Sequence, residues 1–131
     1  MKPRSSSRGR LSRSAEFERV YRQGRSTANR HLVLYSFPNS AAQRPRLGLS
    51  VSRKVGGAVA RNKVKRLLRE AFAGAEAELD PGQDIVVVAR PQARELAERE
   101  GLAGIDASLS ELIEKAGLRG GSVARSDEQV A

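Results

Sequence analysis

Residues 58–73 carry an apolar stripe and a cationic stripe side by side, and this pattern constrains the fold more than any other feature of the sequence. At about 100° per residue, an apolar arc of about 140° consists of Val64, Leu67, Leu68, Ala71 and Phe72. A neighbouring arc of about 140° consists of Arg61, Asn62, Lys65, Arg66 and Arg69. A helix of this kind packs its apolar stripe on a sheet or another helix and presents its cations outward.

Segments on both sides of this helix predict strands. Residues 46–53 alternate between large apolar and small or polar side chains. The large face, expected in the core, consists of Leu47, Leu49 and Val51, and the small face, expected to stay open, consists of Gly48, Ser50 and Ser52. Residues 84–90 form a mostly apolar run bounded by turn residues, typical of a buried strand. Strand, helix and strand together predict a βαβ unit.

The segment before residue 40 predicts a short helix followed by a strand. Phe17, Val20 and Tyr21 fall on one face of the helix, at spacings of three and four residues. Residues 31–37 then alternate, as a strand with one buried face does. One face of that strand consists of Val33, Tyr35 and Phe37. Because only a loop joins this strand to residues 46–53, we expect the two to form an antiparallel pair.

The chain, of 131 residues, suits one domain with two disordered ends. Residues 1–10 are basic and have little to bury, which predicts a disordered arm. Residues 11–118 form the expected α/β domain, and residues 119–131 a disordered tail. Near its end, the sequence predicts a short helix over residues 91–100 and a final helix that Asp106 caps.

Charge is sorted along the chain in a way that solubility alone does not require. Residues 1–70 hold 18 of the 24 Lys and Arg residues but only three of the 15 acidic residues. A one-sided positive field attracts a polyanion, and nucleic acid is the commonest one. The alternatives are a solvated basic surface without a specific partner and an anionic membrane surface. The membrane is disfavoured because no basic helix carries exposed large apolar residues.

The sequence offers few groups for catalysis by the protein alone. There is no cysteine, and His31 is the only histidine, so a nucleophile would lack a recognisable base. The basic half has too few carboxylates for a two-metal nuclease. The longest wholly apolar run, residues 85–89, is far shorter than the roughly 20 residues of a membrane span. We therefore expect a soluble, cytoplasmic protein that binds a partner and has no catalytic residues of its own.

The aromatic residues admit two interpretations. Phe17, Tyr21 and Tyr35 could stack on unpaired bases, as aromatic side chains do in many RNA-binding proteins. They could equally serve the core, since the chain has only three Phe, two Tyr and no Trp. The sequence leaves both open.

Two stretches of the sequence resemble the bacterial ribonuclease P protein family. The first is SAEFERVYRQG, from residue 14 to residue 24, followed by Ala-Asn-Arg and a strand rich in Leu, Val and Tyr. The second is RLGLSVSRKVGGAVARNKVKRLLREAF, over residues 46–72. Its centre is the pattern Arg-Asn-x-x-Lys-Arg-x-x-Arg, matched here from residue 61 to residue 69. The resemblance covers about residues 11–90 well and the final helix loosely.

The resemblance implies an α/β (α+β) two-layer sandwich, in which a mixed sheet of about four strands packs on helices with a left-handed βαβ crossover. It also implies an extra short strand near residues 24–28. The family protein binds a catalytic RNA, ribonuclease P RNA, and the two remove the 5′ leader of precursor tRNA by Mg²⁺-dependent hydrolysis. Expected partners are therefore that RNA, one protein per RNA, and precursor tRNA, with Mg²⁺ bound largely by the RNA.

The resemblance also assigns roles to residues by position. Contacts to the RNA subunit would come from Arg53, Lys54, Arg61, Asn62, Lys65, Arg66 and Arg69. The leader would lie in a cleft between the first helix and the sheet, touching Phe17, Tyr21, Val33, Tyr35, Ser50 and Ser52. Asn62 would also lie near bound Mg²⁺, although no residue is expected to be a definite metal ligand.

Two other functions compete with this expectation. A ribosomal or general RNA-binding protein could use the same basic surface without any role in cleavage. A self-sufficient nuclease is disfavoured by the missing carboxylate and histidine constellation. A general RNA binder would not need a separate aromatic site, so substitutions of Phe17 or Tyr35 would distinguish it from a ribonuclease P subunit.

Overall fold

The computed structural model describes residues 10–11 and 14–119. In chain order, its elements are α2 (Ser14–Gln23), β1 (Arg25–Ala28), β2 (Leu32–Pro38), β3 (Arg46–Ser50), α3 (Ala58–Ala75), the 3₁₀ turn η1 (Glu76–Glu78), β4 (Gln83–Ala89) and α4 (Gln92–Ala116). The predicted arm and tail lie outside the described residues, except for Arg10 and Arg119. These two form isolated β-bridges with Leu47 and Leu79.

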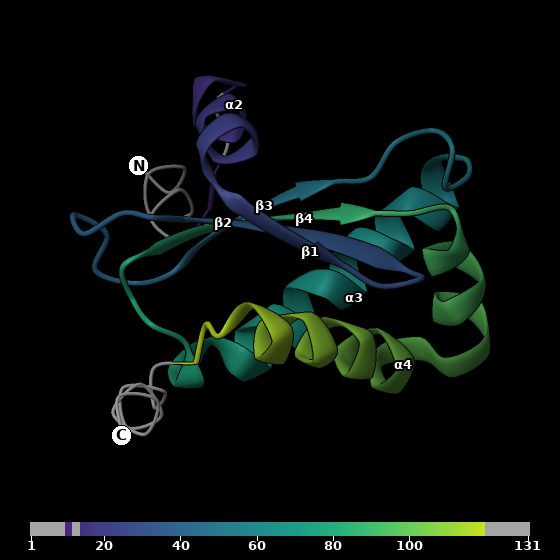
Figure 1. The fold of residues 1–131 in the computed structure, drawn as a ribbon. Coiled ribbons are helices and arrows are strands. Elements are labelled where there is room, and N and C mark those ends of the chain that lie inside the picture. The colour runs from purple at the N-terminus through teal and green to yellow at the C-terminus, as the bar shows by residue number, and fades with distance from the viewer. Residues whose placement is uncertain (1–9, 12–13, 120–131) are drawn as a thin grey trace, which may run out of the picture.

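The four strands form one mixed sheet in the order β1-β2-β4-β3 (Figure 1). β4 is parallel to β3 and antiparallel to β2, so the predicted βαβ unit is confirmed, with α3 in its connection. The short strand expected near residues 24–28 is β1, which pairs antiparallel with β2. The α+β class and the four-stranded mixed sheet are therefore confirmed. The left hand of the crossover stays a prediction.

The expected antiparallel pairing of residues 31–37 with residues 46–53 is wrong, because β4 lies between β2 and β3. β4 is buried at five of its seven positions, so it gains most from a neighbouring strand on each edge. β3 is buried at only two of its five positions and tolerates an edge position, and it ends at Ser50 rather than at residue 53. Local alternation identifies both strands but does not determine which strand takes the centre.

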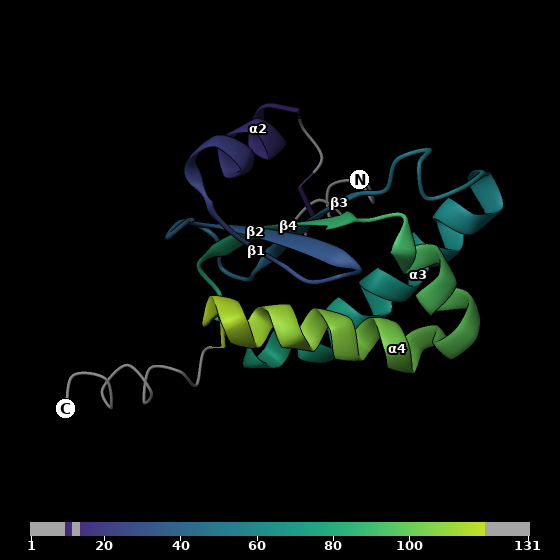
Figure 2. The same cartoon turned by 45° about the vertical axis from the view of Figure 1, so that its right-hand side comes forward.

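Helices lie on both faces of the sheet. α3 and α4 lie side by side against one face, and α2 lies alone against the other (Figures 1 and 2). The main core, between the sheet and the α3–α4 layer, contains all five residues of the predicted apolar stripe of α3. A smaller cluster on the opposite side consists of Leu11, Val20 and Val86, with Phe17, Tyr35, Phe37 and Val88 packed against it.

α4 corrects the predicted C-terminal helices. The structure has one 25-residue segment that is kinked at Gly101, where φ is 59° and ψ is −142°. Glycine adopts this backbone conformation without the steric penalty that a side chain brings. The second half of α4 therefore starts directly after Gly101, and Asp106 lies exposed within the helix rather than capping it. Leu109, Leu112 and Ile113 of this half are buried in the main core.

Candidate nucleic-acid interface

The sheet face that α2 partly covers, called here the α2 face, is built from rows of paired residues. One row consists of Tyr35, Val86 and Gly48, and the next row consists of Val33, Val88 and Ser50. Residues paired across neighbouring strands point to the same side, so these six share the α2 face. The large residues of β3 point to the opposite side and pack in or against the main core. The predicted assignment of large and small residues to opposite faces of β3 is confirmed, but the expectation that the small face stays open is wrong at Gly48, which Phe17 and Leu11 cover.

Three aromatic rings meet between α2 and the sheet. The rings of Tyr21 and Tyr35 have centroids 4.9 Å apart at an interplanar angle of 75°, an edge-to-face contact. Phe17 continues the cluster, with its ring centroid 6.2 Å from that of Tyr21. Tyr21 is 38% exposed. The cluster therefore joins the helix to the sheet and still presents an aromatic surface to solvent.

Phe17 depends on the smallness of Gly48. A Cβ atom built on Gly48 would lie 2.7 Å from Cζ of Phe17, closer than real Cβ contacts allow. Phe17 is also half-buried against the smaller hydrophobic cluster. Each of the two interpretations of the aromatic residues therefore fits a different residue. Phe17 serves the packing of α2, whereas Tyr21 keeps a ring that is accessible for stacking.

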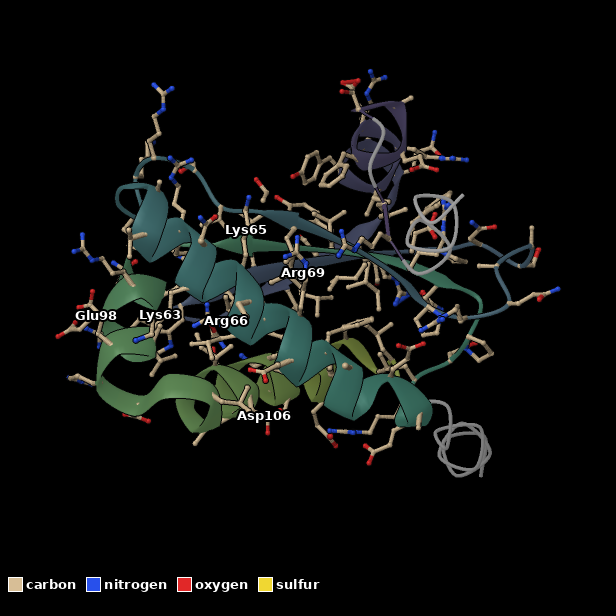
Figure 3. The ribbon with its side chains drawn as sticks, turned by 180° about the vertical axis from the view of Figure 1, so that it is seen from behind. Lys63, Lys65, Arg66, Arg69, Glu98 and Asp106 are labelled. Carbon is tan, nitrogen blue, oxygen red and sulfur yellow. The ribbon has the colours of Figure 1, made fainter. Side chains whose placement is uncertain are left out.

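The predicted cationic arc lies on α3 and is called here the basic stripe. It consists of four cations and one amide: Arg61, Asn62, Lys65, Arg66 and Arg69. Arg61, Lys65 and Arg69 follow one another at spacings of four residues, and Asn62 and Arg66 form a second column. Figure 3 shows Lys65 and Arg66 near one turn of the helix and Arg69 on the next. Arg66 and Arg69 are exposed, Lys65 is half-buried, and Nε of Arg61 is buried with no hydrogen-bond partner within residues 10–11 and 14–119.

In the described structure, the basic stripe lacks the acidic partners that the cations of α4 have. On α4, Arg94, Arg99 and Lys115 each pair with a glutamate at a spacing of four residues. Among the described residues, by contrast, no carboxylate forms an ion pair with any cation of the basic stripe. Unrelieved repulsion between cations along one helix is unfavourable. A bound polyanion would remove this repulsion.

Arg10 adds a cation that sequence reasoning missed. Leu11 donates its backbone N–H to the carbonyl oxygen of Leu47 at 2.9 Å, which fixes the chain beside the edge strand β3. Burial lowers the pKa of Arg69, and the nearby charge of Arg10 lowers this pKa further. Two guanidinium groups therefore lie close enough to repel each other. Only the general basicity of the arm hints at this in the sequence, because the contact depends on where the chain enters the sheet.

The connection between β3 and α3 places two further predicted cations beside the basic stripe. Arg53 and Lys54 are both exposed in a turn. Ser52 lies in the same turn, and its Oγ accepts a hydrogen bond from the backbone N–H of Lys54 at 3.2 Å. The expectation that Ser52 lies on the open face of the strand is therefore wrong, because the strand ends at Ser50.

The described residues offer neither a metal cluster nor a membrane-spanning helix. Within residues 10–11 and 14–119, no three His, Cys, Asp or Glu side chains are grouped so that they could hold a metal ion. In the same part of the chain, none of the helices has the length and hydropathy needed to cross a bilayer. Asn62 is exposed, and a single amide oxygen of this kind fits a contact with a hydrated Mg²⁺, which keeps most of its waters.

The chain is similar to a known protein family and to individual members of it. The model of the ribonuclease P family matches residues 6–117. The ribonuclease P protein component of Shouchella clausii is 46% identical over 107 residues, which cover 82% of this chain and 84% of that protein. The corresponding protein of Geobacillus thermodenitrificans is 41% identical over 108 residues, covering 82% and 86% of the two chains.

Solved structures agree with the sequence comparisons. The ribonuclease P protein of Staphylococcus aureus superposes with a TM-score of 0.76 at 37% identity, over 84% of this chain and 96% of that one. The ribonuclease P protein of Thermotoga maritima gives a TM-score of 0.73 at 33% identity, over 81% and 96% of the two chains. Both sequence and fold therefore point to the same family.

Proposed function

The chain belongs to the ribonuclease P protein family, the protein component of the enzyme that processes tRNA 5′ ends, and from this premise we propose how its two surfaces divide the work. The basic stripe, with Arg53 and Lys54, binds the ribonuclease P RNA. The α2 face and the aromatic cluster bind the single-stranded 5′ leader of precursor tRNA. One protein acts with one RNA, in the cytoplasm.

A single observation supports the first half of this proposal most strongly: the cations of the basic stripe have no acidic partners in the described structure. Arginine gives planar, bidentate donors to phosphate, and lysine gives a compact charge. Bringing the RNA subunit and the precursor together requires two polyanions to approach each other. Cations at their junction lower the salt and Mg²⁺ concentration that this approach needs.

The α2 face suits a single strand of RNA. Its second row, two valines and a serine, carries no bulky side chain, so an extended strand can lie close to the sheet. Tyr21, supported edge-on by Tyr35, offers a ring on which an unpaired base can stack irrespective of its identity. Mature tRNA lacks the leader and would not use this face.

The hydrolysis itself belongs to the RNA in this proposal. The basic stripe consists of cations and one amide, groups that bind and screen phosphate and do not act as general bases at neutral pH. Bound Mg²⁺ would supply the activation of water and of the leaving oxygen, held largely by RNA, with Asn62 near its hydration shell. A general RNA-binding role without cleavage is not favoured, given the family.

Reconstitution tests the proposed function. Removal of the 5′ leader from precursor tRNA is measured at low Mg²⁺ with the protein alone, with a bacterial ribonuclease P RNA alone, and with both. Cleavage at the mature 5′ end that requires both components supports the proposal. Binding of RNA without any rescue of cleavage would favour general RNA binding, and cleavage by RNA-free protein would place the chemistry in the protein.

Replacing Tyr35 by alanine tests the leader site. Tyr35→Ala removes the ring that supports Tyr21, so we expect the affinity of the reconstituted enzyme for precursor tRNA to fall by roughly 1–3 kcal/mol. Tyr35→Phe keeps the ring and should bind as the wild type does. Affinities for precursor and mature tRNA are measured in parallel, and an equal loss for both would contradict the assignment of this face to the leader.

A further inference from the structure

A buried carboxylate lies one row away from the aromatic cluster on the α2 face. Asp84 is 1% exposed near the start of the inner strand β4 and shares its row with Phe37 and Arg46. Arg46 holds it with two hydrogen bonds, from Nε at 3.0 Å and from an Nη atom at 3.2 Å. Asn39 donates to the same carboxylate at 3.2 Å and 3.4 Å. This buried charge is therefore fully enclosed by donors.

The same arginine also reaches the helix above the sheet. An Nη atom of Arg46 donates to the carboxylate of Glu16 at 3.1 Å, and both of these side chains are only about one-fifth exposed, at 20% and 19%. Glu16 lies in the first turn of α2 and directly precedes Phe17. A chain of contacts thus runs from β4 through β3 to α2, here called the Glu16–Arg46–Asp84 network.

α2 has few other anchors. It has ten residues, of which only Val20 is buried, and it contacts β2 and β4 but neither of the other helices to any comparable extent. Apolar contacts to the sheet are non-directional and leave a short helix free to rotate or slide. The guanidinium of Arg46, by contrast, is fixed in direction as well as distance by its two hydrogen bonds to Asp84, and from that position it donates one hydrogen bond to Glu16. Glu16 is thus the directional anchor at the N-terminal end of α2.

From these contacts we propose that Glu16 is a positioning residue for leader binding: through Arg46, itself fixed on Asp84, it sets α2 at the orientation in which Tyr21 and Phe17 meet the α2 face. This inference rests on the proposed function, because it concerns the leader site of the same protein. It assigns no contact between Glu16 and RNA.

The sign of the expected effect separates positioning from simple electrostatics. Removing a carboxylate from an RNA-binding protein lowers its repulsion of phosphate, so electrostatics alone predicts unchanged or tighter RNA binding. Positioning predicts weaker binding of the leader. The two explanations therefore give opposite results for the same substitution.

Glu16→Ala is tested in the reconstituted enzyme against Glu18→Ala as a matched control. Glu18 lies on the same helix and also pairs with an arginine, Arg22, but on the exposed surface at 3.4 Å. We expect Glu16→Ala to weaken binding of precursor tRNA about fivefold, to leave mature tRNA and the RNA subunit unaffected, and Glu18→Ala to cause no loss. Arg46→Lys should act in the same direction, since one ammonium group cannot bridge both carboxylates.

A double-mutant cycle with Tyr21→Ala completes the test. If Glu16 acts through the aromatic cluster, Glu16→Ala should add little to the loss that Tyr21→Ala already causes. Additive losses, an equal loss for mature tRNA, or tighter binding by Glu16→Ala would overturn the proposal. A wild-type enzyme that does not prefer precursor over mature tRNA would instead contradict the proposed function, whatever Glu16→Ala does.

Discussion

Asp84→Asn is expected to lower the free energy of unfolding by about 3 kcal/mol, because it leaves the guanidinium of Arg46 largely without its buried partner. Glu16 retains one contact to Arg46, which places the loss at the low end of what breaking a buried ion pair causes. The side chain of Asn39 would also lose a carboxylate acceptor. Chemical denaturation at fixed salt measures the change, and the melting temperature should fall by roughly 10 °C.

A matched control and a compensating variant sharpen this prediction. Asp106→Asn removes the same charge from the exposed surface of α4 and should change stability by no more than about 0.5 kcal/mol. Replacing both partners, Arg46→Met with Asp84→Leu, should restore most of the stability, since the fully buried charge of Asp84 and its partner are both removed and the carboxylate of Glu16, 19% exposed, still reaches solvent. That double variant should still bind precursor tRNA weakly, because α2 has lost its directional anchor. A stable Asp84→Asn protein would show that the carboxylate contributes little to the fold.

The spacing of apolar and polar residues was sufficient to predict the elements that depend only on their own sequence. The stripe of α3 predicted both its buried residues and its cations, because a helix repeats its faces every few residues wherever it is placed. The order of the strands could not be predicted in this way. β4 lies between β2 and β3 because the strands compete for the most buried position, and the sequence of one strand does not decide that competition.

The functional surface was predictable to a similar extent. The basic stripe followed from helical spacing, and the strand faces followed from alternation. The Glu16–Arg46–Asp84 network was missed because its members are 30 and 38 residues apart in the chain, and Asp84 stands at the start of an apolar run where it resembles a turn residue. A single charged residue bordering a buried strand is a usable signal, since its burial requires a partner.

Arg61→Ala combined with Arg66→Ala is expected to weaken binding of the ribonuclease P RNA roughly 100-fold, since each substitution removes a charge-assisted contact to phosphate. Neither arginine has an acidic partner among the described residues, so the substitutions expose no buried carboxylate. The slope of log K against log salt should become shallower by about 0.7–0.9 per lost contact. Affinity is measured by titration of the RNA subunit over a series of salt concentrations.

The control for this prediction removes the same charge from the neighbouring helix α4. Arg99→Ala with Lys115→Ala takes two cations from α4, where each is paired with glutamate. If the protein attracts RNA only through its net charge of +9, both double variants should lose affinity and salt dependence equally. If the basic stripe is the contact surface, the α4 variant should keep its slope, because counterions are released only where phosphates meet cations. Equal salt slopes for the two variants would therefore show that α3 is not part of the RNA interface. A salt slope that is shallower for the α3 variant by the equivalent of one or more phosphate contacts would place α3 in that interface.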